Sequence, residues 1–251
     1  MQGSRIYWLL PLMALPAVAS PAAIKVVAEA YPPFLIESGP GLSGPYADAF
    51  RILMSRQGIT VSYQSLPLRR AIQQVANPDT CALAVNFAPG EAEIGTYVGR
   101  IAPITLTVYT RVRQSVPLSN IEQLRHRSVG AINIAEIRDL LGTAGIPFVP
   151  VDRPSLGLPM LNAGRFDAFI SDARPDITPA GSAARPFRAF TLARVERWVL
   201  CNAGMSPATL TAMRRALHQG VFAEETQSVW HSYGMDAFYL ETRRQWVQAT
   251  P

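Results

Sequence analysis

The chain has 251 residues, of which 49% are hydrophobic and 16% charged, so it can bury a core and is not a disordered polymer. Its formal net charge is +5, but the basic residues are dispersed in pairs instead of forming a stripe with aromatic residues, so a nucleic-acid-binding protein is not expected. After residue 19, no uncharged apolar run reaches the ~18 residues that a transmembrane helix needs.

The first 19 residues have the pattern of a secretory signal peptide. Arg5 supplies a positive charge, the apolar run over 6–18 is too short to span a bilayer, and small residues occupy 17 and 19. We therefore predict export to the periplasm, cleavage after Ala19 and a mature chain that starts near Ser20. The alternative is an uncleaved membrane anchor, against which the two prolines within the run argue.

Strands and helices alternate along the next part of the chain. Apolar β-branched runs predict strands, and segments between turn residues predict helices. The expected elements are a strand over 24–30, a helix over 48–56, a strand over 59–66, a helix over 68–75 and a strand over 81–87, with a Pro- and Gly-rich loop over 31–45. This order is typical of an α/β layer with a mostly parallel sheet.

The same alternation restarts near residue 104. The expected strands are 104–111, 128–134, 148–151, 166–172 and 190–201, the expected helices are 120–125, 135–145, 155–164, 207–219 and 223–234, and a loop covers 174–186. The restart predicts a second α/β lobe inserted within the first.

Two cysteines, Cys81 and Cys201, lie in this predicted exported chain, one at the start of an expected strand and one at the end of another. An oxidising compartment permits a disulfide between them. If their strands are neighbours, the bond would close a loop of about 120 residues and stabilise the fold by up to ~4 kcal/mol. The alternative is two buried free thiols, because cysteine packs as a small apolar residue.

Several segments, taken in order, resemble the bacterial extracytoplasmic solute-binding proteins of family 3, the polar-amino-acid type that serves ABC importers. The segments are YPPF after the first strand, the step from Gly44 to Asp48, the run from Pro67 through Arg70 to Ala71, CALAVNF, and GRFDAFISD. The resemblance covers nearly the whole mature chain.

This resemblance implies the type II periplasmic-binding-protein fold. That fold is α/β and two-lobed, each lobe being a mostly parallel sheet flanked by helices, with two crossover strands as a hinge. We assign 20–107 and 196–251 to the first lobe and 108–195 to the second. The solute would lie between the lobes.

Six residues are candidate ligand contacts. Five of them follow strand ends, and in open α/β sheets ligands gather beyond the carboxyl ends of strands; the sixth, Arg70, is a candidate because the resembled family has its Arg directly before Ala. The six are Tyr31, Phe34, Arg70, Asn86, Phe87 and Asp172. Tyr31 and Phe34 could stack on a ligand or pack a Pro-stiffened loop. Arg70 could bind a carboxylate with two parallel donors or form a surface ion pair.

The other candidates have alternatives too. Asn86 offers a donor and an acceptor, or is a turn residue. Asp172 corresponds to an acid that, in the resembled family, often meets a ligand ammonium; its alternative is to cap the following loop. Tyr46 is a weaker candidate that could only cover a helix. Asp48 is expected to be structural, at the start of a helix.

One departure from the family pattern concerns the ligand. Amino-acid-binding members carry an Arg shortly after the third strand, but here Ala92 and Glu93 occupy that stretch. Glu cannot replace a bidentate cation. Either Arg70 or Arg100 takes over that role, or the ligand is not a standard amino acid.

Catalytic and metal motifs are not evident. The three histidines are scattered without metal-ligand spacing, no CxxC is present, and no nucleophile elbow or nucleotide-binding fingerprint occurs. The resemblance therefore implies a non-catalytic monomer without cofactor or metal that delivers a small polar solute to the membrane permease of an ABC importer. Two alternatives stay open: an exported dehydratase-like enzyme, with Glu91 or Glu93 as general acid, and a stand-alone ligand-sensing module.

Overall fold

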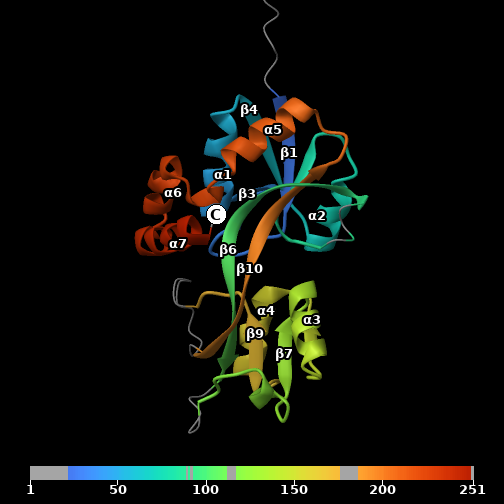
Figure 1. Cartoon of the computed structure of the whole chain (residues 1–251), viewed down its shortest axis with the longest axis vertical. Helices are drawn as coiled ribbons and strands as arrows, with labels where there is room; N and C mark the ends of the chain where they lie inside the picture. Colours follow the sequence, from blue (N-terminus) through green and yellow to red (C-terminus); the bar gives the residue numbers. More distant parts are fainter. Residues whose placement is uncertain (1–21, 89, 91–92, 112–116, 176–185, 250–251) are drawn as a thin grey trace, which may run out of the picture.

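The structure, a computed structural model, describes residues 22–249 except 89, 91–92, 112–116 and 176–185, and the side chains of 247–249 are not described. The predicted signal peptide and its cleavage site lie outside the described residues. The chain forms two lobes that are joined by two long strands running side by side (Figure 1).

The first lobe is built on three parallel strands in the order β4-β1-β5. Its N-terminal elements are β1 (Ala22–Ala28), β2 (Ile36–Ser38), β3 (Gly41–Ser43), α1 (Pro45–Ser55), β4 (Ile59–Ser65), α2 (Leu68–Gln74) and β5 (Thr80–Asn86). The C-terminal part of the chain returns to this lobe with α5 (Pro207–Ala216), η3 (Gly220–Phe222), η4 (Glu224–Thr226), α6 (Gln227–Ser232) and α7 (Asp236–Ala249).

The second lobe is also built on parallel strands, in the order β9-β7-β8. Its elements are η2 (Glu122–Leu124), β7 (Val129–Ile132), α3 (Ala135–Thr143), β8 (Val149–Val151), α4 (Pro154–Asn162) and β9 (Ala168–Ser171). The predicted alternation of strands and helices in both halves is therefore confirmed.

Strands β6 (Gly95–Thr110) and β10 (Phe187–Asn202) connect the lobes as an antiparallel ribbon. β10 pairs with β5 of the first lobe, and β6 pairs with β9 of the second. The resulting eight-stranded order is β4-β1-β5-β10-β6-β9-β7-β8. Both linking strands are antiparallel to the strands that they join, whereas the strands within each lobe are parallel.

Helix α1 shows how the sequence specifies the core of the first lobe. Buried residues recur at helical spacing, from Tyr46 through Phe50 to Met54. Gly44 precedes the helix with a φ of 104°, and a Cβ there would lie 2.6 Å from the carbonyl oxygen of Phe34, so only glycine fits. Helix α1 packs beside the buried Trp230 of α6 in the same apolar cluster.

Separate apolar clusters fill the two lobes. The cluster of the second lobe is centred on side chains such as Leu106 and Phe169. Along β6 the change from one cluster to the other falls between Ala102 and Ile104. The assignment of 20–107 and 196–251 to one lobe stays a prediction, because the ribbon contributes to both cores.

The predicted disulfide between Cys81 and Cys201 is confirmed. The two residues are directly opposite in the antiparallel pairing of β5 and β10, with their Cα atoms 4.0 Å apart and their sulfurs bonded. The bond attaches the linking ribbon to the sheet of the first lobe.

Three stretches differ from the sequence-based expectation. β6 begins at Gly95, nine residues before the predicted strand start at 104. Gly95 and Gly99 interrupt the apolar pattern because their backbones pack closely: an added Cβ would lie 2.6 Å from the Cys201 carbonyl oxygen and 2.9 Å from the Leu217 side chain.

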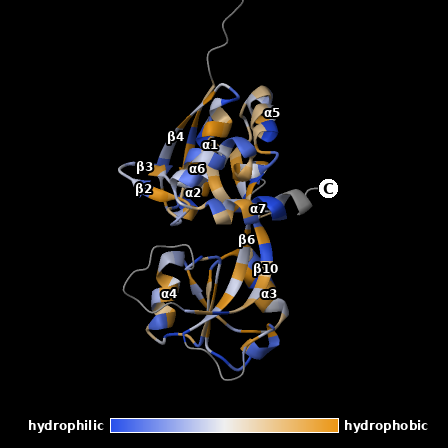
Figure 2. Cartoon of the chain, turned by 90° about the vertical axis from the view of Figure 1, so that its left-hand side faces the viewer, coloured by the Kyte–Doolittle hydropathy of each residue, from blue (hydrophilic) through white to orange (hydrophobic). Residues whose placement is uncertain are grey.

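The other two differences lie at the start and end of the first lobe. The stretch expected to be a loop holds the short β2–β3 hairpin. Helix α7 was not expected at all, because charged residues such as Glu241 and Arg243 dilute its apolar spacing. Tyr239, Thr242 and Trp246 nevertheless lie on its buried side. Figure 2 shows α7 at the edge of the first lobe, next to the linking ribbon.

Candidate ligand-binding site

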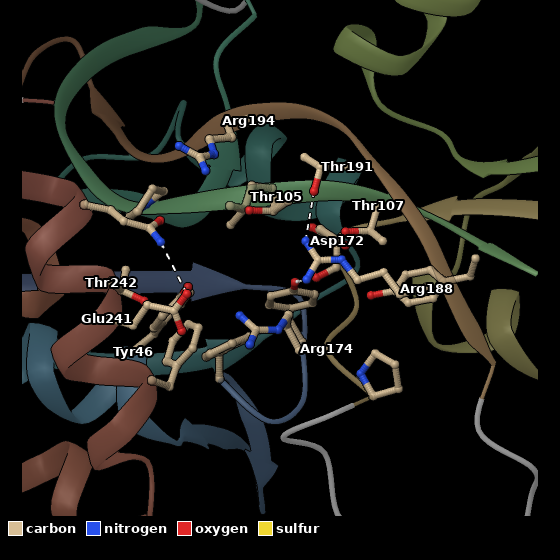
Figure 3. A pocket seen from close by; sticks show the side chains of 18 of the residues that line it. Tyr46, Thr105, Thr107, Asp172, Arg174, Arg188, Thr191, Arg194, Glu241 and Thr242 are labelled. Atoms are coloured by element: carbon tan, nitrogen blue, oxygen red, sulfur yellow. Dashed lines mark hydrogen bonds between the residues drawn. The ribbon is translucent and has the colours of Figure 1, made fainter. Parts of the chain in front are cut away.

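A cavity of about 340 Å³ opens beside the linking ribbon, between α7 and the segment after β9 (Figure 3). This volume is within the range of small-molecule sites. The lining residues come from both lobes and from the ribbon: Tyr31, Phe34, Tyr46, Pro103, Ile104, Thr105, Thr107, Tyr109, Asp172, Arg174, Pro175, Pro186, Arg188, Thr191, Arg194, Phe238, Glu241, Thr242 and Gln245.

The side of the cavity formed by the ribbon is a ladder of cross-strand pairs. Arg188 lies opposite Tyr109, Thr191 opposite Thr107, and Arg194 opposite Thr105. Residues that are directly opposite in an antiparallel pair share one face of the sheet. All six line the cavity.

The spacing of the β10 members of this ladder requires β-bulges. Arg188, Thr191 and Arg194 are three residues apart, whereas side chains on one face of a regular strand are two apart. Register shifts occur between Arg188 and Phe190 and between Thr191 and Ala193. Each shift places an extra residue on β10 and so returns the next polar side chain to the cavity face. Figure 3 shows Arg188 hydrogen-bonded to Thr191, with an Nη2–Oγ1 distance of 2.8 Å.

Aromatic rings line another part of the cavity. The Phe34 ring lies 5.4 Å from the Tyr31 ring, 4.7 Å from the Tyr46 ring and 5.3 Å from the Phe238 ring, measured between centroids. The guanidinium of Arg174 lies 4.9 Å from the Phe238 ring centroid, in a cation–π contact. This part of the cavity thus offers ring surfaces together with one cation.

A buried network connects the lobes at the back of the cavity. Arg197 of β10 donates to the carboxylate of Asp172, which follows β9, and to the side-chain oxygen of Asn86 at the end of β5. The side chain of Asp172 is fully buried, and that of Arg197 is 8% exposed. Tyr31 of the first lobe donates its hydroxyl to the backbone oxygen of Asp172 at 2.9 Å.

This network sets the protonation of its neighbours. Burial raises the pKa of the Tyr31 hydroxyl well above its ordinary value, and the carboxylate of Asp172 raises it further. Burial likewise raises the pKa of Tyr46, although Arg197 partly opposes that shift. Both tyrosines are therefore neutral hydrogen-bond donors at neutral pH.

Glu29, directly after β1, also lies near this network. Burial raises the pKa of its carboxyl group, and the backbone of Leu68 and the charges of Arg197 and Arg153 lower it less. Arg153 belongs to the second lobe, so Glu29 and Arg153 form a further electrostatic link across the gap. Sequence reasoning did not single out Glu29, although it follows a strand end as Tyr31 does.

The structure brings four of the six predicted contacts together. Tyr31, Phe34 and Asp172 line the cavity, and Asn86 bonds to the arginine that holds Asp172. The weaker candidate Tyr46 also lines it, fully buried.

The two remaining candidates lie elsewhere. Phe87 is 47% exposed, and its ring lies tilted against those of Tyr97 and Trp198, at centroid distances of 4.7 and 5.6 Å. Arg70 is exposed on α2 and does not line this cavity. The role of all six as ligand contacts stays a prediction.

Other residues from the sequence analysis have structural contacts. Asp48 lies in the first turn of α1, where it accepts from Tyr233 at 2.6 Å and pairs with Arg51. Arg100 pairs with Glu196 at 2.6 Å across the ribbon and is not among the residues that line this cavity. Glu93 is exposed, and Ala92 and Glu91 lie outside the described residues.

Sequence reasoning missed several lining residues. Arg194 lay inside the strand predicted over 190–201 and Arg188 just before it, and only the bulges place both of them on the cavity face. Glu241 and Thr242 belong to the unexpected helix α7. Arg197 had a detectable signal, since it is a lone cation in the otherwise mainly apolar end of a strand.

Solved structures with the same architecture include both solute receptors and sensor domains. The VFT2 domain of Bordetella pertussis BvgS, in a double-mutant form, matches with a TM-score of 0.67 and 16% identity over 84% of this chain and 92% of that one. An ancestral arginine-binding protein bound to arginine matches with 0.64 and 15% identity, over 85% and 99% of the two chains. A histidine kinase sensor domain with similarity to periplasmic binding proteins matches with 0.64 and 16% identity, over 89% and 95%.

The chain has the two-lobed fold of periplasmic binding proteins. No family model matches the chain, and no curated protein sequence matches it. At these identities the likeness concerns the fold alone, so membership of family 3 stays a prediction.

Two observations bear on where such a fold would work. A disulfide such as Cys81–Cys201 persists in oxidising compartments, which favours a location outside the cytoplasm. In the part of the chain that the structure describes, none of the helices has the length and apolar character needed to cross a bilayer. Within the same residues, no group of three or more His, Cys, Asp or Glu side chains is arranged to hold a metal ion.

Proposed function

We propose that this protein is an exported ligand-binding module that captures a small polar solute between its two lobes. The observation that carries the proposal is the cavity whose lining side chains come from the first lobe, the second lobe and the ribbon between them. A solute held by groups from both lobes stabilises the arrangement in which those groups converge, so its binding energy favours closure.

We further propose that the module works in the periplasm as a monomer after cleavage of residues 1–19, and delivers its solute to the permease of an ABC importer. The arginine-binding protein among the similar structures supports the solute-binding part of this role. Mass spectrometry of the protein recovered from its own compartment tests export. A mature N-terminus near Ser20 is expected, with a mass two hydrogen atoms below that of the reduced form.

A sensing role is the second candidate, and it has a specific observation in its favour. One of the similar structures is a histidine kinase sensor domain with similarity to periplasmic binding proteins, and it matches over 89% of this chain. Co-purification from detergent-solubilised membranes separates the two roles: recovery of importer subunits supports transport, and recovery of a membrane receptor supports sensing.

The proposed module is not an enzyme. Glu93, one of the two candidate general acids, is exposed and lies outside the cavity lining. An assay of prephenate and arogenate turnover tests this part of the proposal, since dehydration of either substrate would contradict it.

Thermal unfolding tests the binding function itself. The mature protein is heated with millimolar amino acids, polyamines and organic acids in turn. A ligand at 100 times its Kd should stabilise the fold by ~2.7 kcal/mol, which for a chain of this size raises Tm by about 5–10 °C. The absence of a shift with every compound would contradict the proposal.

A further inference from the structure

The cavity carries more positive than negative charge. Its lining includes the guanidinium groups of Arg174, Arg188 and Arg194 and the carboxylates of Asp172 and Glu241. Asp172 is neutralised by Arg197, which is not among the lining residues. Counting Arg188 and Arg194 alone, two cations against the carboxylate of Glu241 leave an excess of one positive charge, and a hollow with such an excess attracts anions.

The ladder on the ribbon combines these cations with hydroxyl groups. On β10, Thr191 lies between Arg188 and Arg194. On β6, Thr107 lies opposite Thr191 and Thr105 lies opposite Arg194. Guanidinium and hydroxyl donors on one face suit the oxygens of a carboxylate. Both arginines are exposed, and neither forms an ion pair with any residue that the structure describes.

The ladder can also meet two anionic groups at once. The β6 residues opposite Arg188 and Arg194 are Tyr109 and Thr105, four residues apart. That separation corresponds to ~13 Å along a strand, and arginine side chains are long enough to approach each other over it. A ligand with one carboxylate could bind either Arg188 or Arg194, and a short dicarboxylate could bind both.

A cationic ligand has no comparable partner in the cavity. Asp172, the acid that the family resemblance assigns to a ligand ammonium, is fully buried and already bound by Arg197. Only Oδ2 of that carboxylate is bonded to Arg197, and Oδ1 has no hydrogen-bond partner among the described residues. The adjacent guanidinium nevertheless compensates the charge of the carboxylate and would repel an incoming ammonium. The other carboxylate in the cavity lining belongs to Glu241, which is exposed and accepts a hydrogen bond from the Gln245 side chain at 3.4 Å.

The aromatic part of the cavity indicates what the rest of the ligand is. The rings of Phe34 and Phe238 are buried beside Tyr31 and Tyr46, which are neutral donors. Such a wall accepts an apolar or planar group and offers it no charge. The volume of about 340 Å³ limits the ligand to a small molecule.

We infer that the cavity binds a small organic carboxylate, with its carboxylate on the arginine ladder of Arg188 and Arg194 and its apolar body against the rings of Phe34 and Phe238. This inference rests on the proposed binding function and adds the chemical class of the solute. It differs from a simple transfer of amino-acid specificity, because recognition does not involve an ammonium at Asp172.

Isothermal titration of the mature protein tests the inference. The probes are phenylacetate and succinate as carboxylates, L-arginine and putrescine as cationic compounds, and inorganic phosphate as a non-carboxylate anion. At least one of the two carboxylates should bind more tightly than the cationic compounds and than phosphate. Its affinity should fall as NaCl is raised, because exposed guanidinium groups are screened.

Two variants and a control locate the binding. Arg188→Gln and Arg194→Gln should each weaken carboxylate binding about 10- to 100-fold, since a hydrogen bond to a charged group contributes ~1.5–3 kcal/mol. Arg214→Gln removes an exposed arginine of α5 outside the cavity and should leave the affinity unchanged. Both ladder arginines are exposed, so the variants should fold, and circular dichroism checks this.

The outcomes separate this inference from the proposed function. Tight binding of arginine or putrescine but of neither carboxylate would overturn the inference while the binding function stands. Equal binding of phosphate would overturn the carboxylate class, and carboxylate binding that both ladder variants retain would overturn the site. If no probe and no compound of the wider thermal panel binds, the proposed function itself fails.

Discussion

Strand β10 contains arginines in two contrasting environments. Arg197 is buried, and its partners Asp172 and Asn86 come from the chain itself. Arg188 and Arg194 are exposed on the cavity side of the same strand. Within one strand, one guanidinium is thus buried in a network that connects the lobes, and the other two are exposed beside the cavity, where we propose that the solute binds.

The largest expected effect comes from removing the buried cation. Arg197→Met should lower the free energy of unfolding by about 3–5 kcal/mol, because it leaves the Asp172 carboxylate buried without its partner. Urea denaturation measures this loss. The matched change Arg188→Met, on the exposed side, should alter stability by less than ~0.5 kcal/mol.

A second substitution shows whether the loss has the stated cause. Adding Asp172→Asn to Arg197→Met removes the unpaired charge and should restore part of the stability. If Arg197→Met and Arg188→Met have the same free energy of unfolding, the burial of Arg197 does not make it more important for stability than the exposed Arg188.

The disulfide provides the next largest effect. The double variant Cys81→Ser/Cys201→Ser should lower the free energy of unfolding by about 2–4 kcal/mol, because the open chain gains the entropy of a loop with a sequence separation of 120 residues. Thermal unfolding of the variant beside the oxidised wild type measures the difference. Wild type treated with a reductant should match the variant, and a wild type that is insensitive to reduction would contradict the expectation.

A smaller effect is expected at the hydrogen bond between the lobes. Tyr31→Phe removes the hydroxyl that donates to the Asp172 backbone oxygen at 2.9 Å and keeps the ring. The expected loss is about 1 kcal/mol, with a shift of the lobes toward separation that small-angle scattering would register as a larger radius of gyration. Tyr233→Phe, which removes a hydroxyl bonded within the first lobe, is the control and should leave that radius unchanged.

The smallest expected effect concerns Glu29 and depends on pH. Burial raises the pKa of its carboxyl in the folded protein. The stability that this group contributes is therefore fully present below its unfolded pKa and is lost as the pH rises through the folded pKa. Glu29→Gln should raise Tm by only about 1–2 °C at pH 8, and the gain should vanish toward pH 4. A lower Tm for the variant at pH 8 would mean that the charge of Glu29 stabilises the fold.

Much of the architecture could be predicted from local pattern. The strand that contains Val26 and Val27 and the helix that buries Phe50 and Met54 show their pattern in the sequence. These two elements depend on short stretches of chain, which is why sequence reasoning reached them. The disulfide between Cys81 and Cys201 was one of two alternatives that their places in the sequence left open, and the pairing of β5 with β10 decides between them.

The cavity depends on features that short stretches do not contain. The bulges that bring Arg188 and Arg194 to one face exist only in the pairing of β10 with β6. The contribution of α7 depends on its packing next to Tyr46, almost 200 positions earlier in the chain. Asp172 was selected as an acceptor for a ligand, and only the folded chain shows that Arg197 occupies it.

The register shifts in the ribbon have a mechanical consequence. The rungs of the ladder lie on the two strands that must flex or twist whenever the lobes move apart. A ligand bound to both Arg188 and Arg194 would therefore restrict the bending of the linking ribbon, so the stiffness of the ribbon would rise with ligand occupancy.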